Sequence, residues 1–187
     1  MKKVFLSLFA VAAIGLSANA QQVVKFGPKA GVNISNLSGE ADTDMKVGFH
    51  VGAFAEIFFT DKFALQPELL YSAQGAKDSD VDVKTNLDFI NIPIMAKYYV
   101  IDNLAVEAGP YVGFLMKAEF KGDNGSLDIK DHMNTVDFGL GIGASYNLDN
   151  GFFGGARYQL GLSDVQKDNN GDAVKNGVIQ ISVGYKF

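Results

Sequence analysis

The last ten residues of the chain alternate between apolar and polar side chains, position by position. One face of this segment carries Ile179, Ile181, Val183, Tyr185 and Phe187, and the other carries Gln180, Ser182, Gly184 and Lys186. A period of two residues predicts a β-strand with one apolar face. The pattern recurs in about eight blocks of roughly ten residues, the length that a tilted strand needs to cross a bilayer. Because the other face of each block is charged, hydroxylated or glycine, the pattern favours a membrane barrel over a soluble β-sandwich.

Two kinds of connection separate these blocks. Three are tight and contain Asp or Asn, at 60–62, 101–103 and 149–151, and four are long and polar, at 36–46, 75–85, 121–132 and 164–176. The predicted strands are residues 25–35, 47–59, 63–74, 87–99, 104–118, 134–147, 152–163 and 177–187. Tight and long connections alternate, so the sequence predicts an all-β, eight-stranded antiparallel up-and-down transmembrane barrel. Its tight turns and both termini are expected to be periplasmic, and its long loops extracellular.

Four prolines lie inside the predicted strands: Pro28, Pro67, Pro93 and Pro110. Proline has no N–H to donate to a ladder of strand hydrogen bonds, so it is usually confined to strand edges and bulges. We therefore expect bulges or local irregularity at these four positions.

The N-terminal segment has the features of a secretory signal peptide. Lys2 and Lys3 precede an apolar run, Val4 to Leu16, which is shorter than the roughly 20 residues of a spanning helix. The apolar run is followed by a short segment of small residues that ends at Ala20, which is typical of a cleavage site. Cleavage is therefore predicted between Ala20 and Gln21. Residues 1–20 are thus the expected signal peptide and residues 21–187 a single barrel domain; without a cysteine after the apolar run, a lipoprotein is excluded.

Composition narrows the possible functions. The chain has no cysteine, which excludes disulfides, thiolate catalysis and cysteine metal sites. When Lys2 and Lys3 are left out, 14 of the 16 basic residues remain, and with 21 acidic residues the formal charge is −7. This excess of acid argues against nucleic acid or an anionic membrane surface as a partner.

The expected interior of the barrel contains balanced fixed charges. The inward positions carry four basic and four acidic residues: Lys29, Lys97, Arg157, Lys186, Glu56, Glu68, Glu107 and Asp137. An eight-stranded barrel is only just wide enough for its own side chains, and charges held there must pair. The sequence therefore predicts a charged structural plug, with a gated ion path as the functional alternative.

Folding the strands about their tight turns suggests specific ion pairs. A hairpin about Asp102 places Lys97 opposite Glu107. A hairpin about Asp61 places Glu56 opposite Gln66 and diagonal to Glu68, and the planar fork of Arg157 is the cation expected to hold both acids. Room for the arginine is expected from inward-facing glycines on the neighbouring strand: Gly139, Gly141 and Gly143.

Two further chemistries are suggested by local patterns. The hairpin about Asp61 also places His50 opposite Ser72, a base and a hydroxyl that could support hydrolysis, although no third group is placed to orient the imidazole. Two acidic segments, 78–82 and 168–172, offer the oxygen ligands that calcium prefers. Neither segment completes a calcium-loop motif, which favours solvated acidic loops; no cofactor and no metal site is predicted.

Three internal segments resemble the recurrent strand motifs of the PorT-like outer membrane β-barrel family. They are Leu65-Gln66-Pro67-Glu68-Leu69-Leu70-Tyr71-Ser72, Ile92-Pro93-Ile94-Met95-Ala96-Lys97-Tyr98-Tyr99 and Ala108-Gly109-Pro110-Tyr111. Gln21 and the ending Tyr185-Lys186-Phe187 are similar to that family's termini. The resemblance implies an eight-stranded barrel in an outer membrane, with Tyr185 and Phe187 in the closing signal that the assembly machinery reads, and one branch of the family is associated with protein secretion.

These observations favour a non-enzymatic outer-membrane barrel that acts as an anchor, a surface-binding protein or a secretion accessory. Its expected partners are outer-membrane lipid, the assembly machinery during insertion and an unknown protein at the extracellular loops. A narrow porin is the main alternative. A lipid-modifying enzyme would depend on His50 or Ser72, and a soluble ligand-binding barrel would need an apolar interior.

Overall fold

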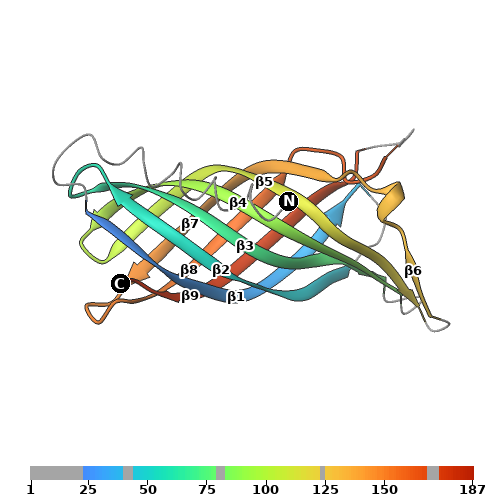
Figure 1. Ribbon diagram of the computed structural model, residues 1–187, viewed down its shortest axis with the longest axis horizontal. Helices are drawn as coiled ribbons and strands as arrows, with labels where there is room; N and C mark the ends of the chain where they lie inside the picture. The colour runs from blue at the N-terminus through green and yellow to red at the C-terminus, as the bar shows by residue number, and fades with distance from the viewer. Residues whose placement is uncertain (1–22, 40–43, 79–82, 123–124, 168–172) are drawn as a thin grey trace, which may run out of the picture.

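The computed structural model describes residues 23–39, 44–78, 83–122, 125–167 and 173–187. Among these residues, eight long antiparallel strands close into a barrel (Figure 1). They are β1 (Val24–Ser38), β2 (Asp44–Phe58), β3 (Phe63–Asp78), β4 (Val83–Ile101), β5 (Leu104–Gly122), β7 (Val136–Asn147), β8 (Phe152–Gly161) and β9 (Lys175–Tyr185). Each strand pairs with its neighbour along the chain, and β1 pairs with β9 to close the ring. The predicted fold class is thereby confirmed.

Two short elements between β5 and β7 were not predicted. Strand β6 (Gly125–Asp128) folds back onto the end of β5, and the 3-10 helix η1 (Lys130–His132) follows it. Figure 1 shows β6 at one end of the barrel, and the C-terminus and the tight turns at the other. We call these the loop end and the tight-turn end.

Much of the sequence expected to form long loops is paired strand. Ladder pairing of β3 with β4 reaches Asp78 and Val83, well inside the predicted loop 75–85. Pairing of β4 with β5 likewise reaches Lys121. Polar composition misled the prediction, because above an apolar belt both faces of a strand are free to carry polar side chains.

The side chains alternate between the two sides of the barrel wall. In β7 the even-numbered residues Val136, Phe138, Leu140 and Ile142 are exposed on the outside, whereas Asp137 and Ser145 are buried inside. The same alternation on the other strands gives the barrel an apolar outer belt and a filled interior. No helix among the described residues is long and apolar enough to cross a membrane.

The prolines interrupt the ladder without changing its register. Pairing of β2 with β3 stops for two residue pairs beside Pro67, and the pairing of β3 with β4 and of β4 with β5 stops similarly beside Pro93 and Pro110. The register shifts lie elsewhere, between Met45 and His50, after Asp88, and between Tyr99 and Ile101. The expected local irregularity is therefore present beside Pro67, Pro93 and Pro110 but not at Pro28, and no bulge lies at any of the four prolines. A missing donor loses local hydrogen bonds but does not require an extra residue.

The C-terminal strand is held at the seam of the barrel. The Phe187 N–H donates to the carbonyl of Phe26 at 2.9 Å. The Phe187 ring, 67% exposed, contacts the rings of Phe26 and Tyr185 at centroid distances of 5.8 Å and 4.9 Å. These contacts join the last residues to β1 on the outer face.

Replacement of Phe187 by Asp is expected to reduce folding into lipid vesicles sharply, because it puts a carboxylate on the apolar outer face at the closing seam. Phe187→Tyr keeps the ring and serves as the control. The folded fraction can be measured by heat-modifiable gel migration, and an unchanged fraction for Phe187→Asp would contradict this role for the closing strand.

Candidate functional site

The interior near the tight-turn end is organised around Glu56. This carboxylate is fully buried and lies 3.1 Å from the ammonium of Lys97 and 2.5 Å from that of Lys186. The Tyr99 hydroxyl donates to it at 2.7 Å and accepts a hydrogen bond from Lys186 at 3.0 Å. Two cations and a phenol thus compensate a single buried acid.

Deeper in the barrel, Glu68 is the centre of a second cluster. Arg157 donates to its two oxygens at 2.6 Å and 2.9 Å, which is the bidentate arrangement that a planar guanidinium allows. Lys29 donates to the same carboxylate at 3.1 Å and 3.2 Å. The Nε of Arg157, which is not bonded to Glu68, donates to Glu107 at 2.7 Å.

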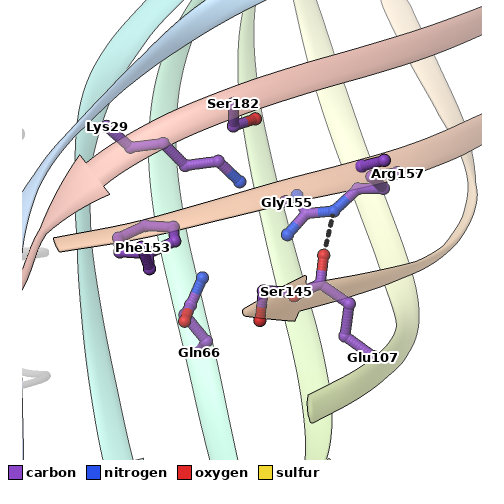
Figure 2. A pocket seen from close by; sticks show the side chains of 9 residues that line it. Lys29, Gln66, Glu107, Ser145, Phe153, Gly155, Arg157 and Ser182 are labelled. Carbon is purple, nitrogen blue, oxygen red and sulfur yellow. Dashed lines mark hydrogen bonds and ion pairs between the residues drawn. The ribbon is translucent and has the colours of Figure 1, made fainter. Parts of the chain in front are cut away.

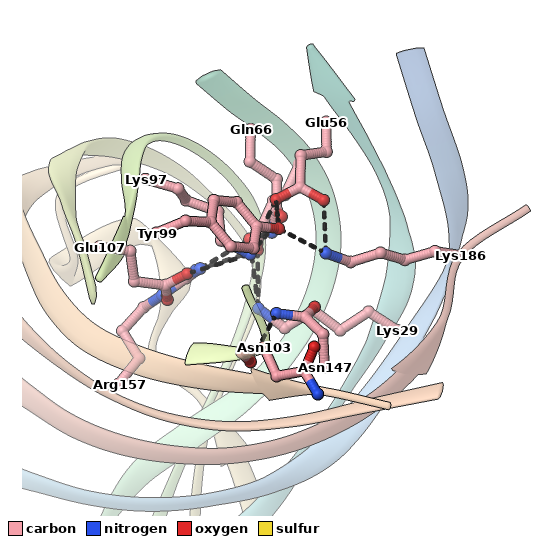
Figure 3. Close-up of polar contacts among 11 residues, drawn as sticks. Lys29, Glu56, Gln66, Lys97, Tyr99, Asn103, Glu107, Asn147, Arg157 and Lys186 are labelled. Atoms are coloured by element: carbon pink, nitrogen blue, oxygen red, sulfur yellow. Dashed lines mark hydrogen bonds and ion pairs between the residues drawn. The ribbon is translucent and has the colours of Figure 1, made fainter. Parts of the chain in front are cut away.

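A glutamine joins the two clusters into one network (Figure 3). Gln66 accepts a hydrogen bond from Lys97 at 3.0 Å and donates to Glu68 at 2.7 Å. Lys97 lies directly opposite Glu107 in the ladder, as predicted, but its ammonium is 4.0 Å from that carboxylate and closer to Glu56. The network therefore holds four cations and three acids among the described residues.

Arg157 does not hold Glu56, contrary to the prediction. It binds Glu68 and Glu107, while the lysines bind Glu56. Strand pairing explains this: Arg157 lies opposite Gly143, and Gly143 lies opposite Glu107. Two of the three expected glycines give this space, because a Cβ atom at Gly141 would lie 3.4 Å from the Arg157 Cδ and one at Gly143 3.1 Å from its Cβ. Gly139 instead lies against Leu160 and Tyr111.

Asp137 is buried but has no ion-pair partner in the described part of the chain, so its assignment to the charge network was wrong. It accepts hydrogen bonds from Tyr111 at 3.0 Å and from Ser163 at 2.5 Å. Both donors are hydroxyls near the loop end, away from the lysines and Arg157.

The interior at the loop end contains an apolar cluster, which the sequence analysis did not foresee. Nine buried residues form this apolar cluster: Leu37, Ala76, Leu87, Phe89, Leu115, Ala118, Met133, Val165 and Val174. Six of them come from the inward faces of β1, β3, β4 and β5, and the last three come from the segments beside β7 and β9. Their inward direction could have been found by extending the strand alternation into the predicted loops.

The space left in the interior is small. A cavity of about 10 Å³ lies beside Arg157, Lys29 and Ser145 (Figure 2), which is about the room of one water molecule. A wider vestibule of about 630 Å³ opens at the tight-turn end, and Tyr99 and Lys186 form its floor. The charged network and the apolar cluster thus separate this vestibule from the loop end.

His50 and Ser72 face each other in the ladder, as predicted, but do not form a hydrogen bond. The imidazole Nε2 lies 2.9 Å from the Ser182 hydroxyl, and its Nδ1 lies 2.8 Å from the Asn33 amide oxygen. Ser72 instead accepts hydrogen bonds from Asn33 and Gln74. A group that orients the imidazole is therefore present, but the histidine is only 1% exposed.

The candidate calcium segments, 78–82 and 168–172, fall almost entirely outside the described residues, as does the predicted signal peptide. Elsewhere in the described ranges, no cluster of three His, Asp or Glu side chains is placed to hold a metal ion.

Comparison with known proteins identifies the family. The sequence profile of the outer membrane protein beta-barrel domain matches residues 19–167, and no curated protein matches the chain. Among solved structures, the chain is similar to Neisserial surface protein A, with 16% identity and a TM-score of 0.60 over 87% of this chain and 97% of that protein.

It is also similar to Ail, the attachment invasion locus protein of Yersinia pestis, with 16% identity and a TM-score of 0.53 over 87% of this chain and 98% of that one. Identity this low shows a shared fold, whereas the family profile covers most of the sequence. The chain therefore belongs to the outer membrane protein beta-barrel domain family and is an integral outer-membrane barrel protein.

Proposed function

We propose that this protein is a non-enzymatic barrel whose interior is a structural plug and whose loop end binds a partner outside the cell, as an anchor, an adhesive surface or a secretion accessory. The observation that carries the proposal is the double closure of the interior. Seven charged groups occupy the interior near the tight turns, and the apolar cluster, together with buried polar side chains such as Gln74 and Asn176, occupies the interior near the loop end.

The loop end supports a binding role because it is ordered by packing. Strands β3, β4 and β5 continue beyond the apolar belt, and β6 adds a further strand to them. An ordered surface loses little conformational entropy when it binds a partner. One solved structure of Ail holds a heparin analogue, so a barrel of this fold can present a ligand-binding surface.

Several finer assignments belong to the same proposal. Residues 1–20 are a signal peptide cleaved after Ala20, both termini are periplasmic, and Tyr185 and Phe187 belong to the signal for the assembly machinery. The PorT-like motifs point to a family of such barrels, one branch of which is associated with protein secretion. A narrow channel is the second candidate, favoured by the vestibule of about 630 Å³ at the tight-turn end.

Replacement of Arg157 by Met is expected to destabilise the refolded barrel by about 3–5 kcal/mol, because Glu68 and Glu107 would lose their shared cation inside the wall. Arg157→Lys should recover part of the loss, since an ammonium cannot fork to two carboxylates. Urea unfolding in micelles measures both variants.

The same experiment distinguishes the partners of Arg157. Double-mutant cycles of Arg157→Met with Glu68→Gln or Glu107→Gln should show coupling, whereas the cycle with Glu56→Gln, the matched control, should be nearly additive. Coupling to Glu56 alone would contradict the network.

Orientation can be tested by thiol labelling, because the chain has no cysteine. Ser126→Cys in β6 should react with a membrane-impermeant maleimide on intact cells, and Asp61→Cys at the tight-turn end should react only after lysis. Both residues are exposed in the structure, so the two variants are matched. The reverse result would invert the proposed topology.

The refolded protein is expected to show negligible single-channel current in planar bilayers. Current should stay negligible in the variant that combines Arg157→Met with Glu68→Gln, because the apolar cluster still closes the loop end. A stable open channel in the native protein at neutral pH would favour the porin alternative instead.

A further inference from the structure

Three lysines lie in one row across the outer face of the sheet near the loop end. Lys77 of β3 is directly opposite Lys84 of β4, and Lys84 is directly opposite Lys121 of β5. We call these residues the lysine row. The inward positions of the same strands carry buried members of the apolar cluster, namely Ala76, Leu87 and Ala118. The row therefore points away from the barrel interior, with Lys84 and Lys121 exposed and Lys77 half-buried.

This arrangement is unfavourable for the protein alone. Side chains directly opposite each other on antiparallel strands have Cβ atoms about 4.5–5.5 Å apart, and like charges at such positions are destabilising. Asp44 of β2 lies directly opposite Lys77 on the other side of β3, but among the described residues no acidic side chain forms an ion pair with any of the three ammonium groups. An anion between them would turn this repulsion into attraction.

Four other lysines at the same end are bound by the protein itself, whereas Lys175 of β9 lies outside the row and forms no ion pair among the described residues. Lys117 pairs with Glu119 at 2.8 Å, while Lys46 and Lys130 donate to backbone carbonyls at 2.7 Å and 2.9 Å. Lys167 likewise donates to the carbonyl of Asp131 at 3.1 Å. In the described part of the chain, the three ammonium groups of the lysine row form no hydrogen bond and no ion pair, and the exposed Lys84 and Lys121 have no acidic residue directly opposite them, so they are available to a ligand.

The position of the row relative to the apolar belt indicates which ligand. On the outer face of β4 and β5, Ile90 opposite Phe114 is the last apolar pair, and Asp88 opposite Lys117 is the first charged pair. Lys84 lies four residues beyond Asp88, which on a strand tilted by about 40° raises it by about 10 Å. This height is close to the outer edge of a headgroup layer, since headgroups add roughly 5–8 Å on each side of the hydrocarbon core.

We propose that the lysine row binds the phosphate groups of anionic lipids that surround the loop end of the barrel. The proposal rests on the proposed membrane placement of this end, and it assigns the row a lipid rather than a soluble anion because the ammonium groups project sideways at headgroup height. The chain as a whole has a formal charge of −5, so attraction to an anionic lipid must come from a local patch such as this one.

Native mass spectrometry of the full-length protein in a neutral detergent can test the proposal. The probes are bisphosphorylated lipid A, the same lipid with both phosphates removed, and inorganic phosphate. The native protein should bind the bisphosphorylated lipid about tenfold more tightly than the dephosphorylated one. The variant with Lys77→Gln, Lys84→Gln and Lys121→Gln should lose this preference.

A pair of single variants controls for net charge. Lys84→Gln changes the centre of the row, whereas Lys175→Gln removes one charge from β9, at the same end but outside the row. The first should weaken binding of the phosphorylated lipid and the second should not. Heat-modifiable migration establishes that each variant is folded.

Equal weakening by both single variants, or an unchanged preference in the triple variant, would overturn the proposal. Displacement of the lipid by an equimolar amount of inorganic phosphate would also overturn it, in favour of a site for free phosphate. Because this binding is measured in detergent, its failure is independent of the thiol-labelling result that tests orientation.

Discussion

The constraint on which the structure depends is that an eight-stranded barrel must fill its own interior. Charged side chains in that space cannot keep their hydration, so each one needs a partner inside the wall. Glu68 satisfies this requirement with two cations, because Arg157 occupies both of its oxygens and Lys29 adds a third donor. The network then extends through Gln66 and Glu107 until the barrel is closed from one side to the other.

Backbone details far apart in the sequence serve this filling. Gly141 and Gly143 have no side chain on the inner wall, and the long side chain of Arg157 occupies the space that results. A Cβ atom at either position would be in tight contact with the arginine or with Met95. Gly141 and Gly143 of β7 thus support the charge network although they carry no charge, because their small size lets β8 and the Arg157 side chain approach closely.

The sequence predicted the barrel more fully than its interior. Alternation fixes the direction of each side chain, so Lys97 opposite Glu107 and His50 opposite Ser72 follow from the hairpin turns. The choice of partner does not follow, because it depends on how far each side chain reaches across the lumen. Glu56, for example, pairs with Lys186 from the far end of the chain, a contact that closure of the ring makes possible.

The loop end was predicted least well, for a related reason. Leu87 and Leu115 point inward above the charged layers, where polar neighbours such as Asp88 and Lys117 hide the period of two. A bulge after Asp88 changes the register there and further weakens the pattern.

The two halves of the interior also differ in the physical cause of the free-energy cost of opening them. Opening the charged half would separate ions from their partners, whereas opening the apolar cluster would expose side chains such as Phe89 and Leu115 to water. A solute that crossed the barrel would have to displace both the ion network and the apolar cluster. The two free-energy penalties therefore add along a single path. Under the proposed function, filling of this kind stabilises the barrel wall and opposes transport, so molecular recognition would use the outer faces of the strands and the loop end.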